Sequence, residues 1–208
     1  MDTVHLSVMS GKLKGMPAIN TNTLDNPFCQ VMALSGIPSL ICSGAGDKPQ
    51  CYSWAMLSGS RKNCIPKFQQ NSDVLSEVIP WDYLPVFNSP NVRYHGHGEL
   101  INLEHMVNFH HIALKNPQTM FALWSKRRDI IISYHKTYKQ PDNLILVYSN
   151  PSTKYLLHKP PAGFDKVFNV VSEPHTGENC TGKRCTECLS CYRHSGESVL
   201  IEHVKVRN

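Results

Sequence analysis

The stretch that decides the fold is Thr119–Asn150, "TMFALWSKRRDIIISYHKTYKQPDNLILVYSN". Two short apolar runs, 119–125 and 143–150, flank a segment at 126–140 whose pattern could be helical. A short apolar run bounded by polar residues is typical of a strand buried on both faces of a sheet. The stretch therefore predicts a β/α unit, in which a helix connects two parallel strands.

The same rhythm recurs on both sides of this unit. Residues 100–116 form an amphipathic helical pattern, and a helix is also expected around 68–78. Further strands are predicted at 39–42, where the first strand would end at Cys42, at 91–95, at 165–173 and, as a closing strand, over 197–208. The chain, residues 1–208, is thus expected to be a single α/β domain with a mainly parallel sheet or partial barrel, and a Cys-rich metal-binding segment at 173–195 within it.

Composition limits the class of protein and its location. The chain has 208 residues and a formal charge of +5. It has no apolar run long enough to cross a bilayer and no secretory pattern at its start, which predicts an intracellular protein without a membrane partner. The basic residues form no block, so nucleic-acid binding is compatible with the charge but not indicated by it. In a reducing compartment, the eight cysteines favour metal binding over disulfides.

Chemistry is expected at the loops that follow the strands, because parallel α/β folds carry their sites at the carboxyl ends of the strands. Four residues there are candidates for holding a substrate: His95, His97, Glu99 and Lys126. Histidines two residues apart can bind metal, Gly96 and Gly98 would let a ligand approach the backbone, and Glu99 could instead cap the next helix. Together these loops would form one rim at the carboxyl edge of the sheet. The residues expected on this rim are Cys42, His95, His97, Glu99, Ser125, Lys126, Ser149, His175 and the cysteines from Cys180 to Cys191.

The strongest motif is the cysteine run in "ENCTGKRCTECLSCYRH" (178–194). Its pattern is C-x4-C-x2-C-x2-C, formed by Cys180, Cys185, Cys188 and Cys191. Closely spaced C-x2-C-x2-C runs hold iron–sulfur clusters, whereas four-cysteine zinc sites more often use two knuckles far apart. The motif predicts a [4Fe–4S] cluster, with zinc as the alternative metal and free redox thiols as a third reading.

A second, weaker cysteine set is Cys42 and Cys51, in "CSGAGDKPQCYSW". Its position is similar to that of the cluster in radical S-adenosylmethionine enzymes, although that usage has three closely spaced cysteines. Both thiols could instead be small buried hydrophobes, or one or both could join the C-terminal cysteines around one metal centre. Cys29 and Cys64 are expected to be core or surface thiols. The helix histidines His105, His110 and His111 are likewise expected to serve packing.

Several segments together resemble the bacteriophage gene-product-88-like family of Cys-rich phage proteins: "LKGMPAINTNTLDNPFC", "ICSGAGDKPQCYSW", "NVRYHGHGELINLEHMVNFHHIALKNPQTMFALWSK" and "CTGKRCTECLSCY". The resemblance implies a phage-encoded iron–sulfur protein in the host bacterial cytoplasm, on a scaffold like a degenerate radical-SAM fold. It supports as functional residues Cys42, Cys51, the four cysteines of the run, His95, Gly98 and Glu99. The sequence departs from the family pattern where "GDKPQ" replaces a middle cysteine and where the acidic turn reads Gly-Glu after a histidine.

Three functions follow as hypotheses. The first is an electron-transfer or redox protein holding one [4Fe–4S] cluster, with a redox partner or host protein that the sequence does not identify. The second is a radical-SAM-like enzyme that uses the cluster and S-adenosylmethionine on a substrate held by the four candidate residues of the rim. The third is a zinc-clipped module that contacts nucleic acid through Lys183, Arg184 and Arg193.

Overall fold

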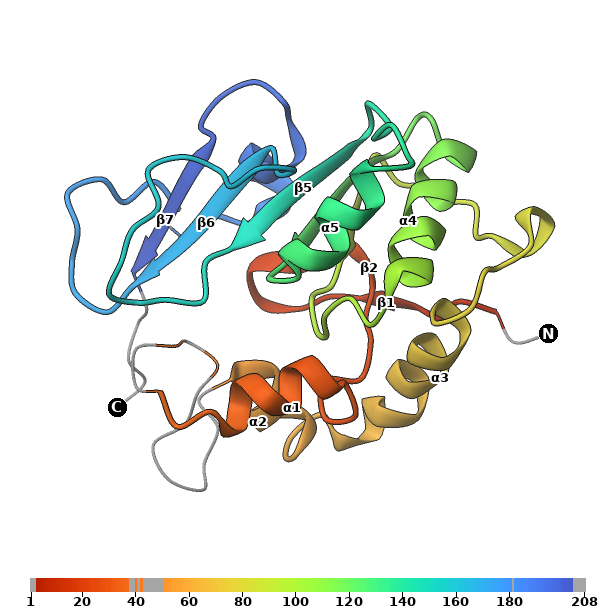
Figure 1. Cartoon of the computed structure of the whole chain (residues 1–208), viewed down its shortest axis with the longest axis horizontal. Helices are drawn as coiled ribbons and strands as arrows, with labels where there is room; N and C mark the ends of the chain where they lie inside the picture. The colour runs from red at the N-terminus through yellow and green to blue at the C-terminus, as the bar shows by residue number, and fades with distance from the viewer. Residues whose placement is uncertain (1–2, 38–39, 41, 43–50, 181, 204–208) are drawn as a thin grey trace.

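The strands form one sheet whose spatial order follows the chain. The computed structural model describes residues 3–37, 40, 42, 51–180 and 182–203. Strand β1 is antiparallel to β2, and every later neighbour pair is parallel (Figure 1). The strands are β1 (Leu6–Val8), β2 (Pro17–Ile19), β3 (Asn91–Tyr94), β4 (Met120–Ser125), β5 (Leu144–Ser149), β6 (Lys166–Val171) and β7 (Val199–His203). The predicted α/β class and mostly parallel sheet are confirmed.

The helices fall in the connections between these strands. The α-helices are α1 (Pro27–Leu34), α2 (Tyr52–Leu57), α3 (Ile65–Leu75), α4 (Leu103–Lys115), α5 (Arg128–His135) and α6 (Cys185–Cys188). Short 3-10 turns are η1 (Gly11–Leu13), η2 (Lys62–Cys64), η3 (Trp81–Tyr83) and η4 (Ser190–Tyr192). None of the helices in the described part of the chain combines the length and the apolar character needed to span a membrane.

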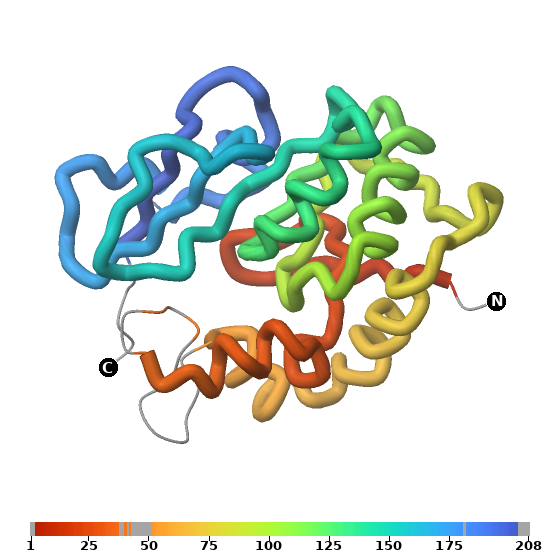
Figure 2. Tube along the Cα trace, in the orientation of Figure 1, coloured from red at the N-terminus to blue at the C-terminus, as the bar shows by residue number. Residues whose placement is uncertain are grey.

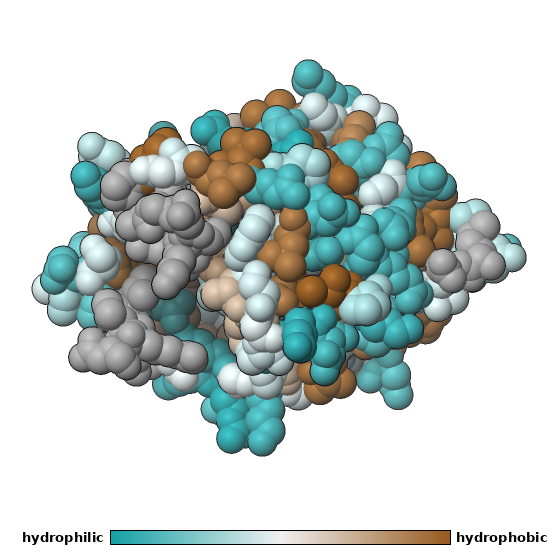
Figure 3. Space-filling model, turned by 90° about the horizontal axis from the view of Figure 1, so that it is seen from below, coloured by the Kyte–Doolittle hydropathy of each residue, from teal (hydrophilic) through white to brown (hydrophobic). Residues whose placement is uncertain are grey.

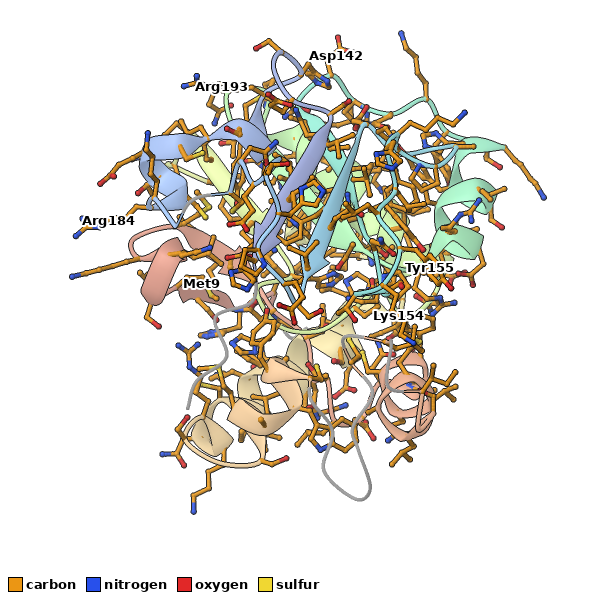
Figure 4. All side chains as sticks on the ribbon, turned by 90° about the vertical axis from the view of Figure 1, so that its left-hand side faces the viewer. Met9, Asp142, Lys154, Tyr155, Arg184 and Arg193 are labelled. Atoms are coloured by element: carbon orange, nitrogen blue, oxygen red, sulfur yellow. The ribbon has the colours of Figure 1, made fainter. Side chains whose placement is uncertain are left out.

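The sheet has two differently covered faces, because alternate residues of each strand point to opposite sides. On β4, Phe121 and Leu123 join the large core under α4 and α5, whereas Ala122 joins a smaller cluster on the other face. The large core includes Tyr94 stacked on Phe109, with ring centroids 3.9 Å apart. In Figure 4, α5 lies on one side of the sheet and the segment containing α6 lies on the other.

Helices α1, α2 and α3 form a separate layer, below the sheet in Figures 1 and 2. Helix α1 begins after Asn26, whose Oδ1 accepts hydrogen bonds from the backbone N–H groups of Phe28 and Cys29 at 3.0 and 3.2 Å. Figure 3 views this layer from below and shows apolar and polar side chains intermixed. Exposed apolar residues of α1 include Val31 and Leu34, at 71% and 72% exposure.

The first strand predicted at 39–42 lies largely outside the described residues, and its described residues are not part of the sheet. The parallel part of the sheet begins with β2 instead, a three-residue strand that is too short to show a period-two pattern. Residues 39 and 41 lie outside the described residues, and Leu40 forms only an isolated bridge with Ser152. The strands predicted at 91–95, 119–125, 143–150 and 165–173 correspond to β3, β4, β5 and β6.

The Pro-rich connection between α3 and β3 is held in place by side chains of α4. Asn108 is fully buried, and its Nδ2 donates to the carbonyl oxygens of Leu75 and Glu77 at 2.9 and 2.7 Å. Its Oδ1 accepts from the backbone N–H of Ile79 at 2.9 Å. One asparagine thus satisfies three backbone groups that no regular element would pair.

Candidate functional site

The carboxyl ends of β3, β4 and β5 meet around the buried carboxyl group of Glu99. Glu99 is 4% exposed, and its Oε1 accepts a hydrogen bond from Ser125 Oγ at 2.6 Å. Its Oε2 accepts from the backbone N–H of Lys126 at 2.8 Å. Burial raises the pKa of Glu99, and the charge of Lys126 and these hydrogen bonds oppose the shift. Three residues predicted for one rim are therefore in direct contact.

Lys126 extends this network across the sheet edge. Its Nζ donates to Ser149 Oγ at 3.1 Å, which joins the end of β4 to the end of β5. Burial would lower the pKa of Lys126, but the neighbouring Cys42, Glu99 and Cys51 outweigh that effect and raise it. Lys126 is consequently a firmly held cation at the carboxyl edge.

Three thiols, those of Cys29, Cys42 and Cys51, are electrostatic neighbours of this cation. Cys42 and Cys51 are joined by a side-chain hydrogen bond, which raises the pKa of Cys42 and lowers that of Cys51 to about 6. Hydrogen bonds from the first backbone amides of α2 and the charge of Lys126 also favour the Cys51 thiolate. Cys29 is an electrostatic neighbour of Cys42 and Lys126, and burial raises its pKa. Cys51 and Cys29, the latter expected to be a core or surface thiol, are thus electrostatic neighbours of Cys42, which was predicted for the rim.

The two histidines of the "HGHGE" turn are both buried, and neither faces open solvent. His97 has Nδ1 2.8 Å from Ser53 Oγ and Nε2 3.2 Å from a guanidinium nitrogen of Arg61. Because a guanidinium only donates, Nε2 accepts and Nδ1–H donates to Ser53, and burial followed by Arg61 lowers the pKa of His97 to about 4. His97 therefore fixes α2 and the following turn to the rim as a neutral imidazole.

His95 is in the left-handed backbone region, with φ of 60°, and is 3% exposed. Its ring packs 5.1 Å from the ring of His105 and 5.3 Å from that of Phe109. Neither ring nitrogen forms a well-aligned hydrogen bond within the described residues. Burial lowers the pKa of His95 to about 3, and a weak interaction with the Trp124 backbone opposes the shift. The residue is a neutral, packed side chain in this arrangement.

The glycines of the same turn allow close packing within the chain. Gly98 has φ of +99°, and a Cβ atom there would collide with Thr21 Oγ1 and lie 2.8 Å from the Thr21 carbonyl oxygen. A Cβ atom at Gly96 would meet the side chain of Met9. The space expected for a ligand is occupied by the loop after β2 and by Met9.

The four-cysteine segment covers the sheet face opposite α4 and α5. Cys185, Leu189 and Cys191 pack against the smaller apolar cluster, which contains Ala122 and the buried ring of Tyr192. Leu189, with φ of 54°, makes the left-handed turn between α6 and η4. The segment therefore lies on the face of β4 and β5, whereas the rim prediction placed it at their carboxyl ends. His175 is exposed and accepts a hydrogen bond within its own turn, from Gly177 N–H at 2.9 Å.

The four thiols of this segment are electrostatic neighbours of one another. Burial raises the pKa of Cys180, Cys185 and Cys191, that of Cys191 to about 12. Cys188 adds to the shift in each case, and all three other thiols add to it at Cys191. Cys188 is the exception, because hydrogen bonds from the Ser190 hydroxyl, at 3.1 Å, and the Ser190 backbone lower its pKa.

Two cations from distant parts of the chain face this thiol group. Lys12 of η1 has Nζ 3.9 Å from Cys180 Sγ and also forms an ion pair with Glu202. Arg93 of β3 lies over the Trp124 ring, 3.1 Å from its centroid, and its charge opposes the raised pKa values of Cys185 and Cys191. The sequence prediction assigned the offsetting charges to Lys183 and Arg184. Arg184 instead faces Glu187 at 3.8 Å, and Lys183 acts weakly on Cys188.

Over the described ranges, no set of three or more His, Cys, Asp or Glu side chains already has the arrangement of a metal site. No family model, curated protein or solved structure matches the chain.

Proposed function

We propose that this protein holds a [4Fe–4S] cluster through Cys180, Cys185, Cys188 and Cys191 and has an electron-transfer or redox role. The observation that supports this most directly is the grouping of four thiols, all electrostatic neighbours, on one sheet face beside Lys12 and Arg93. Thiolates are the ligands that iron–sulfur clusters take. The spacing of the run is compatible with a single loop that places three thiolates around one corner of the cluster.

The donor set fits such a cluster in its chemistry. Four thiolates carry four negative charges, and Lys12 and Arg93 offset part of that charge. Cys185 and Cys191 lie against apolar side chains, which would exclude water from one side of the centre. A bound cluster supplies one-electron chemistry, while burial and the nearby cations are what this chain contributes to the reduction potential.

Two further features of the proposal rest on the family resemblance. They are a phage origin with a place in the host cytoplasm, and a likeness of the scaffold to a degenerate radical-SAM partial barrel. The sequential parallel order from β2 to β7 is compatible with that likeness. An enzyme that uses the cluster is the second candidate function, favoured by the buried network of Glu99, Lys126 and Cys51 at the carboxyl edge.

Anaerobic purification of the full chain tests the proposal. We expect a brown protein with iron and sulfide in equal amounts, visible absorption that dithionite bleaches, and a paramagnetic signal in the reduced state. Cys180→Ser should weaken or abolish these signals, whereas Cys64→Ser, which alters a cysteine outside both thiol groups, should leave them unchanged. A colourless protein with stoichiometric zinc would instead favour the zinc module, and salt-sensitive nucleic-acid binding would then be measured.

A further inference from the structure

We propose that the connection between α3 and β3, residues 77–90, is a docking surface for a basic segment of a partner protein. The segment would carry a Lys or Arg side chain flanked by apolar residues. The inference goes beyond the proposed redox function and is independent of it, because 77–90 contains no cysteine.

Four large apolar side chains of this connection are exposed to solvent. They are Val78, Trp81, Tyr83 and Val86, which are 60%, 49%, 52% and 67% exposed. The connection is drawn in yellow in Figure 1, where it projects at the right-hand edge of the molecule beside α4. Single exposed apolar residues are common on protein surfaces, but a group of them on one projecting segment is typical of an interaction site.

Lys115 of α4 fixes the aromatic part of the connection. Its Nζ donates to the carbonyl oxygens of Trp81, Asp82 and Leu84, at 2.8, 3.3 and 2.9 Å. An ammonium group has three N–H donors, so these bonds use all of them. The charge of Lys115 is therefore directed at the backbone of its own chain, and the turn is held in one conformation without a partner.

Asn116, which follows α4, fixes the second half of the connection. Its Oδ1 accepts from the backbone N–H of Phe87 at 2.7 Å, and its Nδ2 donates to the Pro85 carbonyl oxygen at 2.9 Å. Asn108 fixes the first half through the backbone N–H of Ile79. A surface whose backbone is already ordered loses less conformational entropy on binding, so its exposed side chains are ready for a partner.

The charges of the connection favour one class of partner. Its charged residues are Glu77 and Asp82, both exposed, and it contains no Lys, Arg or His. Neither carboxylate is in an ion pair with another described residue. In a chain whose formal charge is +5, this segment is thus locally acidic. Nucleic-acid phosphates and anionic lipids would be repelled there, whereas a cationic protein segment would be attracted.

The turn η3 combines this charge with two aromatic rings. Asp82 lies between Trp81 and Tyr83 in the sequence of η3, and consecutive residues of a 3-10 turn point in different directions. Aromatic faces and carboxylates both attract the ammonium group of Lys and the guanidinium group of Arg. Trp and Tyr are also prominent among the residues that dominate the binding energy of protein interfaces. We therefore expect Trp81 to be the principal contact, with Val78 and Val86 packing against apolar residues that flank the cation.

The test selects a library of random linear peptides, displayed on phage, on the full chain, with counter-selection on Trp81→Ala. We expect the selected peptides to carry Lys or Arg beside Leu, Val or aromatic residues. A synthetic copy should bind Trp81→Ala about tenfold more weakly than wild type. Tyr155→Ala, which removes an aromatic side chain that is 74% exposed after β5, is the matched control and should bind as wild type does. Selected peptides that are acidic or uncharged, or the absence of any peptide that distinguishes wild type from Trp81→Ala, would overturn the proposal.

A second measurement uses the wild type alone and so covers the case in which Trp81→Ala does not fold. Hydroxyl-radical labelling, read residue by residue by mass spectrometry, should show Trp81 and Tyr83 protected by the bound peptide and Tyr155 unaffected. The protection should weaken as salt is added, because the two carboxylates are exposed. The same labelling with vesicles of anionic lipid, and at a raised concentration of the chain, tests the other occupants. Protection of Trp81 by the vesicles or by self-association would overturn the proposal, because it would assign the surface to a membrane or to a second copy.

Discussion

Replacing His95 by phenylalanine should change how the stability of this protein depends on pH. The imidazole ring is buried against His105 and Phe109, and burial lowers its pKa to about 3. A phenyl ring has a similar shape, keeps those ring contacts and does not titrate. The substitution therefore removes one proton-binding group and leaves most of the packing in place.

The magnitude follows from linkage. The imidazole is neutral in the folded chain down to about pH 3, but it takes up a proton in the unfolded chain below its ordinary pKa of about 6.5. Its contribution to stability is fully present above pH 6.5 and is lost at about 1.4 kcal/mol per pH unit as the pH falls. Between pH 7.5 and pH 4.5 the wild type should thus lose about 2.7 kcal/mol through His95 alone.

Guanidinium unfolding of both proteins, followed by circular dichroism at several pH values, measures this difference. The stability of His95→Phe relative to wild type should rise by about 2.7 kcal/mol on going from pH 7.5 to pH 4.5. His105 and Glu99 are present in both proteins, so their own titrations largely cancel. His175→Gln, at an exposed position, is the matched control. A relative stability that stays constant with pH would show that His95 is not held neutral by burial.

Two further substitutions test how the site is supported. Gly98→Ala should destabilise the fold by about 2–4 kcal/mol, because φ is +99° and the new methyl group collides with Thr21. The control Gly11→Ala, with φ of +63° and open space around it, should cost only about 1 kcal/mol. Equal melting temperatures for the two variants would contradict the packing of the turn at Gly98. Asn108→Ala should cost about 3 kcal/mol, because it leaves buried backbone groups without partners, and the exposed Asn63→Ala provides the comparison in the same denaturant titration.

The strands that sequence could predict are those with continuous apolar runs. Residues 119–125 and 143–150 are apolar because β4 and β5 are covered on both faces. The apolar run predicts each strand whichever elements cover it. Strand β2 was not predicted because three residues carry no measurable periodicity. The contact between Glu99 and Lys126 followed from the rule that parallel strands end at one edge, and the structure brings these residues together.

Other parts of the candidate site depend on contacts that spacing cannot show. Cys29 and Cys42 are thirteen residues apart with most of α1 between them, so spacing alone does not show that they are electrostatic neighbours. Lys12 and Arg93 reach the four-cysteine segment only because η1 and β3 lie beside it. Which face of the sheet the segment covers depends on the burial of Tyr192 against β4 and β5, which is a tertiary contact.

The order of the strands has a consequence for how this chain reaches its folded form. Each strand from β2 to β7 pairs with the strand that precedes it, so the sheet can grow in the direction of synthesis as the chain emerges from the ribosome. The four-cysteine segment connects the last strand pair, β6 and β7, and packs on strands β4 and β5, which precede it in the chain. The sheet face that this segment covers can therefore form before the segment itself is synthesised.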